Sequence, residues 1–227
     1  MKQIKSLSVM LFCFLFSSCG GGGGGSSGPV TSTLSFPLKS AYQSLVASGF
    51  SKNLSFSGSC SGIGTFSVAA ANTPATFETV SGFSSVATMT TSFTNCTNFA
   101  SSITYYYDSN YVELGYTSTT DYDVFTSPLS IPTSVMVGDT GILGTETLYT
   151  NSSKTTTTGT RQNSYIVQPD TADSAIVVLI SNHYDTSPVL ISSEQDSYRI
   201  TSLGALVPLK FDYQEYSPAF HLVATLH

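Results

Sequence analysis

The chain has 227 residues, of which 14 are Asp or Glu and 8 are Lys or Arg, and its formal net charge at pH 7 is −6. Nucleic-acid binding depends on clustered Lys and Arg side chains that release counterions from phosphates, and the sequence has no such cluster. The composition therefore excludes a nucleic-acid partner and allows one large β domain, since β domains of roughly 200 residues often do not divide.

The first 18 residues have the layout of an export signal. Lys2 and Lys5 give a positive start, an apolar run covers residues 7–16, and two serines precede Cys19. An apolar helix of that length would cover about 15 Å, half of a bilayer core about 30 Å thick. We therefore interpret residues 1–18 as a signal peptide and not as a membrane span.

The five residues Leu15-Phe16-Ser17-Ser18-Cys19 resemble the lipobox of bacterial lipoproteins. In that family the signal is cut before the cysteine, which is diacylated on its sulfur. The resemblance implies that Cys19 is lipidated and begins the mature protein, anchored in a membrane through its acyl chains. A glycine follows where an Asp would retain an enterobacterial lipoprotein in the inner membrane. We therefore expect a Gram-negative outer-membrane lipoprotein, on the periplasmic face rather than the cell surface.

A glycine run separates this anchor from the rest of the chain. Residues 20–25 are all glycine, and a segment of this composition behaves as a flexible coil with a root-mean-square span of about 22 Å over 16 residues. We expect residues 19–35 to form a tether and residues 36–227 to form a single β-rich domain.

Two cysteines, Cys60 and Cys96, remain in this domain. An even pair in an exported chain indicates one disulfide. Cys60 lies within Gly58-Ser59-Cys60-Ser61-Gly62, which superficially matches a nucleophile elbow. An elbow requires a following helix, whereas the alternating residues after Gly62 predict a strand, so we interpret Cys60 as structural.

One amphipathic helix is expected over residues 38–46, where apolar side chains recur at intervals of three and four. Pro37 suits its first turn and Gly49 is placed to cap its end. A single amphipathic helix beside many strands must lay its stripe on a sheet or plug the mouth of a barrel.

The remainder of the domain alternates between apolar and polar residues at short spacing, which predicts a mainly β fold: an antiparallel meander, curved sheet or sandwich with one N-terminal helix. Ser and Thr on both faces disfavour a membrane-spanning barrel, whose lipid-facing positions would be apolar. The expected strands of the last third are residues 145–150, 164–168, 175–181, 189–193, 197–202, 205–213 and 219–226.

Two of these strands carry a more detailed prediction. Residues 175–180 are apolar throughout, so we expect cover on both faces. In residues 205–213 the odd-numbered positions, including Val207 and Phe211, are expected to face the core, with Lys210 and Asp212 in solvent. Pro208 indicates an edge strand or a bulge.

Candidate chemical residues are few. Asp121 and Asp123 would share a strand face, but two carboxylates are too few for a cation site, and we interpret them as solvated acids at a strand end. Glycines at intervals of three, followed by Glu146, indicate a turn. His183 lies in a sequence typical of a turn, and the histidines lack metal-ligand spacing. We predict no catalytic residue, no metal, no cofactor and no enzymatic activity.

A tyrosine-rich hairpin is expected over residues 103–116. Tyr105 and Tyr107 would share one face, and we interpret their rings as aromatic packing across paired strands rather than a sugar site. Two functions stay open for the domain. The first is a structural or interaction module with an envelope protein partner. The alternative is a carrier or binding protein for an apolar ligand in a curved sheet closed by the N-terminal helix, and a solid interior would exclude it.

Overall fold

The computed structural model describes residues 31–227. The expected signal peptide, the expected lipidation site at Cys19 and most of the expected tether lie outside the described residues. Within residues 31–227, no helix is long and apolar enough to cross a membrane.

The described chain is mainly β with one helix near its start, as the sequence predicts. The helix α1 covers Leu38–Ser48 and thirteen strands follow it. The strands are β1 (Phe50–Gly58), β2 (Gly62–Val68), β3 (Thr73–Phe77), β4 (Val80–Phe93), β5 (Ala100–Asp108), β6 (Glu113–Thr117), β7 (Tyr122–Phe125), β8 (Thr140–Tyr149), β9 (Thr157–Pro169), β10 (Ser174–Asp185), β11 (Leu190–Thr201), β12 (Leu206–Tyr216) and β13 (Ala219–Leu226).

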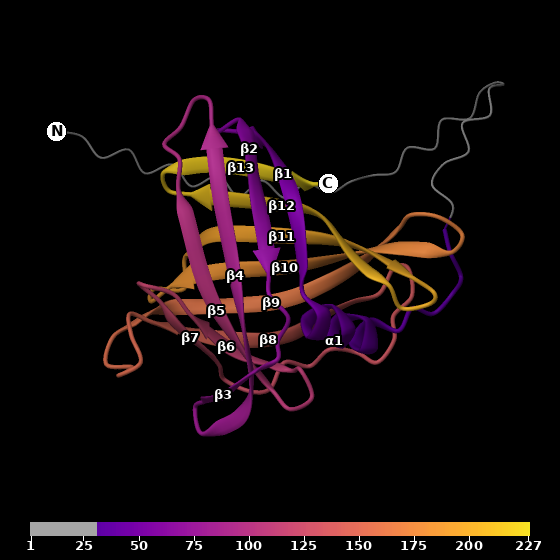
Figure 1. Ribbon diagram of the computed structural model, residues 1–227, viewed down its shortest axis with the longest axis horizontal. Helices are drawn as coiled ribbons and strands as arrows, with labels where there is room; N and C mark the ends of the chain where they lie inside the picture. The colour runs from indigo at the N-terminus through magenta and orange to yellow at the C-terminus, as the bar shows by residue number, and fades with distance from the viewer. Residues whose placement is uncertain (1–30) are drawn as a thin grey trace.

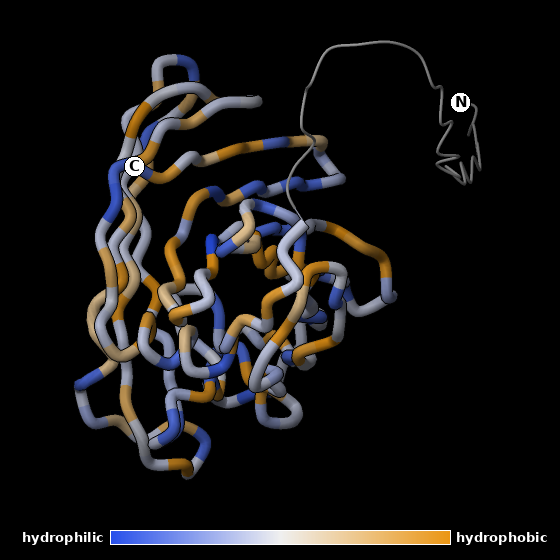
Figure 2. Tube along the Cα trace, turned by 90° about the vertical axis from the view of Figure 1, so that its right-hand side faces the viewer, coloured by the Kyte–Doolittle hydropathy of each residue, from blue (hydrophilic) through white to orange (hydrophobic). Residues whose placement is uncertain are grey.

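The strands form one antiparallel sheet that closes on itself. Most neighbours in the sheet are consecutive in sequence, but β1 also pairs with β13 and β2 also pairs with β4. These two pairings join the ends of the meander, so twelve strands form a barrel and β3 extends the edge of β4. In Figure 1, β1, β2, β4 and β5 cross in front of the wall that contains β8 to β12. Figure 2 shows apolar and polar residues alternating along strands that wrap around a common interior.

The helix closes one end of this interior. Its buried residues Leu38 and Ala41 belong to a core cluster with Val167, Ala175 and Ile200. Each of these three strand residues lies near an end of its strand, and all three ends are adjacent in the sheet. The helix therefore plugs the barrel mouth at that end, as its apolar stripe allows.

The helix ends where the sequence predicts. Gly49 donates its backbone N–H to the carbonyl oxygen of Leu45 at 2.8 Å. Its φ of 65° lies in the left-handed region, and a Cβ at this position would collide with the carbonyl oxygen of Val68. Glycine is required here because the chain turns directly from α1 into β1 against the backbone that follows β2.

A disulfide joins Cys60, in the turn between β1 and β2, to Cys96, in the loop after β4. This is the pairing expected from the sequence. The same two loops are also joined by hydrogen bonds, in which the Thr94 backbone N–H donates to the Ser61 carbonyl and the Ser61 N–H donates to Asn95 Oδ1.

The interior face of β12 follows the predicted alternation only in part. A register shift opposite Ser197 and Tyr198 places a bulge between Pro208 and Lys210, which confirms the prediction from Pro208. Before the bulge Leu206 is buried and Val207 is 39 % exposed, whereas Phe211 after it is buried. The expectation for Val207 was wrong because the extra residue inverts which positions face inward.

The apolar strand β10 is covered most completely near its start. Ala175 and Val177 are buried on the inner face and Val178 is buried on the outer face. Ile176 and Ile180 on the outer face stay half-buried. Cover on both faces, expected for the whole of residues 175–180, is therefore complete only around Val178.

Candidate ligand cavity inside the barrel

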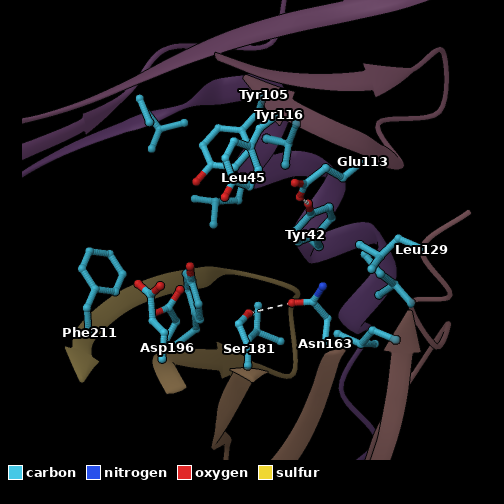
Figure 3. A pocket seen from close by; sticks show the side chains of 18 of the residues that line it. Tyr42, Leu45, Tyr105, Glu113, Tyr116, Leu129, Asn163, Ser181, Asp196 and Phe211 are labelled. Carbon is cyan, nitrogen blue, oxygen red and sulfur yellow. Dashed lines mark hydrogen bonds between the residues drawn. The ribbon is translucent and has the colours of Figure 1, made fainter. Parts of the chain in front are cut away.

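The barrel encloses a cavity of about 360 Å³ next to α1. Its walls come from the inner faces of the two crossing halves of the sheet, with α1 at one side (Figure 3). Most of the lining is apolar, and Leu45 of α1 points into the space. Other apolar lining residues are Phe50, Ile103, Leu143, Leu179 and Phe211. A cavity of this size and polarity falls within the range of small-molecule sites, roughly 300–1,000 Å³.

One arginine organises the polar part of the wall. Arg161 on β9 donates from Nη1 to Glu146 Oε2 at 2.8 Å and to Asp123 Oδ2 at 3.1 Å. Its Nη2 donates to the hydroxyl of Tyr116 at 2.8 Å, and the guanidinium lies 5.2 Å from the centre of that ring. Glu146 and Arg161 are direct partners across β8 and β9, so the strand register itself places this ion pair.

Burial shifts the pKa of these two acids. Asp123 is 1 % exposed and Glu146 is 3 % exposed. Desolvation raises the pKa of both carboxyls, and the Arg161 guanidinium opposes that rise. The arginine is therefore the counter-charge that allows two acids to remain inside the barrel.

The sequence interpretation was wrong for Asp123 and for the glycines that precede Glu146. Asp123 was expected to be solvated at a strand end, but β7 directs it inward. Glu146 was expected beside a glycine turn, but β8 runs through Gly141 and Gly144, and only Gly138 lies in a turn. The glycines make room for aromatic rings, since a Cβ on Gly144 would lie 3.2 Å from the Phe125 ring.

A second group of acids lines the cavity. Glu113 on β6 accepts a hydrogen bond from the hydroxyl of Tyr42 at 3.3 Å. Glu194 and Asp196 occupy successive inward positions of β11. Among residues 31–227, no salt bridge reaches any of these three carboxyls.

Enclosure within the barrel favours the neutral form of these acids. Desolvation raises the pKa of Glu113 to about 8, and the nearby charge of Glu146 adds to that rise. Glu194 lines the cavity, and desolvation raises the pKa of its carboxyl although part of the residue stays exposed. Desolvation raises the pKa of Asp196 strongly, and the neighbouring Glu194 charge raises it further.

Asp196 also has an unsatisfied oxygen. Its Oδ1 is buried and has no hydrogen-bond partner. Figure 3 shows this side chain directed toward the cavity from β11. Buried polar atoms are nearly always hydrogen-bonded, so an orphaned oxygen on a cavity wall marks a place where a bound molecule would supply a donor.

The tyrosines of the hairpin have both a packing role and a place at the site. Tyr105 and Tyr107 share the inner face, as predicted, and Tyr105 packs against its cross-strand partner Tyr116 with ring centres 5.6 Å apart. Tyr105 also lines the cavity. Sequence reasoning missed Glu113, Glu194 and Asp196 as site residues. Glu194 and Asp196 alternate with neutral residues, and this spacing could have indicated two acids on one face of a strand.

The histidines lie outside this cluster. His183 is within β10 and not in the expected turn, its Nε2 is buried without a partner, and desolvation lowers the pKa of its ring. His221 bonds Asp212 at 2.8 Å, while the Ser59 hydroxyl accepts from the backbone of His221 and not from its ring. Within the described residues, no three His, Cys, Asp or Glu side chains are arranged to hold a metal ion.

The fold and the cavity together define a closed antiparallel β-barrel with a ligand-sized interior. No protein family, enzymatic or otherwise, matches the sequence, and no curated protein matches it. The chain is similar to the solved structure of a protein from Bacteroides fragilis that is inferred to be exported and described as having a YmcC-like fold. The match has 9% sequence identity and a TM-score of 0.37, and it covers 85% of this chain and 97% of that one. A likeness at this level defines neither a family nor a function.

Proposed function

We propose that the protein is a lipid-anchored envelope protein that carries or binds an apolar ligand inside its barrel. The observation that supports this proposal is the cavity beside α1, because a solid interior would have excluded a carrier. The sequence placed a structural or interaction module first and the carrier second. We now prefer the carrier, because an unfilled space costs stability and a purely structural domain would gain from filling it.

The binding test is a fluorescence titration with N-phenyl-1-naphthylamine, an apolar dye whose emission rises when it leaves water. The protein should bind the dye saturably at one site. Replacing Leu45 by Trp would place a larger ring in the cavity and should weaken binding at least about tenfold, a loss of about 1.4 kcal/mol.

The matched control for this variant is Leu203→Trp, because Leu203 is 96 % exposed in a loop outside the cavity. Leu203→Trp should bind the dye like the unmodified protein. Equal dye binding by all three proteins would place the dye elsewhere and refute the proposed site. No dye binding by the unmodified protein would return preference to the interaction module.

The anchoring part of the proposal is supported by the lipobox-like residues that end at Cys19. Cys19→Ser should remove the protein from the membrane fraction, and mass spectrometry of the unmodified protein should find acyl chains on Cys19. Cys13→Ser is the matched control, because it changes a cysteine inside the expected signal and should leave the anchor intact. An unmodified thiol at Cys19 would contradict the proposal.

A further inference from the structure

The cavity wall carries more acids than basic side chains to pair with them. Arg161 is already bonded to Asp123 and Glu146. That leaves Glu194 and Asp196, side by side on the inner face of β11, without a basic side chain in the described chain to pair with them. Two neighbouring carboxyls enclosed by protein repel each other when both are ionised, and they attract any cation that reaches them.

A second observation points to a ligand at this pair. Asp196 Oδ1 is buried and unpartnered, and the Asp196 side chain points toward the cavity. The surrounding wall is apolar, with Phe211 beside Asp196 and with Leu45 and Leu129 further along the cavity (Figure 3). A molecule that satisfies both regions needs a donor at one end and a hydrocarbon body at the other.

We propose that the barrel selects amphiphiles with a cationic amine at the polar end, held by Glu194 and Asp196, with the hydrocarbon lying against the apolar wall. This inference rests on the proposed carrier function and names its ligand class. An ammonium group offers up to three N–H donors and a positive charge, so it satisfies Asp196 Oδ1 and offsets the carboxylates together.

Other head groups fit the wall less well. A carboxylate or phosphate would bring further negative charge to two acids that have no basic partner, and the guanidinium that could attract it is already paired within the wall. A hydroxyl could donate to Asp196 but brings no charge. A bare metal ion is disfavoured, because no group of three or more potential ligands in residues 31–227 is arranged to hold one.

The test compares three molecules of equal chain length: dodecylamine, dodecanol and dodecanoate. Each is titrated at pH 7 against the dye-loaded protein, and its affinity is read from dye displacement. The amine should bind at least about tenfold more tightly than the alcohol, a difference of about 1.4 kcal/mol, and the alcohol more tightly than the carboxylate. Equal or tighter binding of the carboxylate would overturn the inference and leave the carrier function standing. Displacement by none of the three would contradict the carrier function itself.

The double variant Glu194→Gln plus Asp196→Asn keeps the shape of the wall and removes the two ionisable groups. It should reduce the preference for amine over alcohol to less than about twofold, chiefly by weakening amine binding. Asp173→Asn, which removes a surface acid, is the control and should keep the full preference. An unchanged preference in the double variant would overturn the assignment of these residues.

A measurement on the unmodified protein tests the same point if the double variant does not fold. Desolvation raises the pKa of both carboxyls, so pairing with an ammonium group should shift them toward their ionised form and release protons. Calorimetry in two buffers of different ionisation heat should therefore detect more proton release on binding dodecylamine than on binding dodecanol. Absence of proton release with the amine would contradict the inference.

Discussion

Replacing Arg161 by Met removes the counter-charge of two enclosed acids and tests how the polar wall is held together. The variant loses hydrogen bonds of 2.8 Å to Glu146, 3.1 Å to Asp123 and 2.8 Å to the Tyr116 hydroxyl. The side chains of Asp123 and Glu146 are only 1 % and 4 % exposed, so water cannot replace the lost partner. Breaking a buried ion pair by removing one member costs about 3–5 kcal/mol.

The assay is urea unfolding followed by circular dichroism, and Arg199→Met is the matched control. Arg199 pairs with Asp170, but its side chain is 47 % exposed. An exposed pair contributes only about 0–1 kcal/mol. We therefore expect Arg161→Met to lower the free energy of unfolding by several times as much as Arg199→Met at pH 7.

Acid should lessen the Arg161→Met defect. Without the guanidinium, the pKa of Asp123 and Glu146 would rise further above the values in the unfolded chain. The folded variant then holds protons that the unfolded chain releases, so its stability falls as pH rises and recovers as pH is lowered. A loss below about 1 kcal/mol at pH 7, with no recovery at lower pH, would refute the view that these acids depend on Arg161.

Three further predictions concern the rest of the barrel. Changing Cys60 and Cys96 together to Ser should lower the free energy of unfolding by about 4 kcal/mol, from the loop of 36 residues that the disulfide closes, and reductant should destabilise only the unmodified protein in urea. Gly49→Ala should cost more than Gly138→Ala in thermal melts, because both glycines have positive φ but only Gly49 meets neighbouring backbone, and equal losses would contradict this. Glu113→Gln should flatten the pH dependence of stability. The pKa of the folded carboxyl, about 8, exceeds that of the unfolded chain, so stability falls as pH rises from about 4.5 through 8, and an unchanged slope in urea titrations would contradict this assignment.

Local signals in the sequence predicted the local structure well. The helix begins at Leu38 and ends before Gly49 because the apolar spacing and the glycine cap act within a few residues. Pro208 correctly indicated a bulge in β12. The cysteine pair correctly indicated a disulfide, because the expected export signal left two cysteines in the domain.

The closure of the sheet and the site inside it depend on distant residues, and the sequence could not show them. No local pattern reveals that β2 pairs with β4 and β1 with β13. Asp123 looked like a solvated acid, and Glu146 showed no sign of a buried ion pair, because their cation, Arg161, comes from another strand. Once the barrel closes, inward positions that would be solvated on an open sheet become enclosed.

The central claim is that the space inside the barrel binds one amphiphile. The most direct measurement is native mass spectrometry of the chain from residue 19 with Cys19→Ser, mixed with dodecylamine. The account predicts a complex with one dodecylamine per chain, and the Leu45→Trp variant should lose it. Several amines bound equally by both proteins, or none bound by either, would contradict a binding site in the cavity.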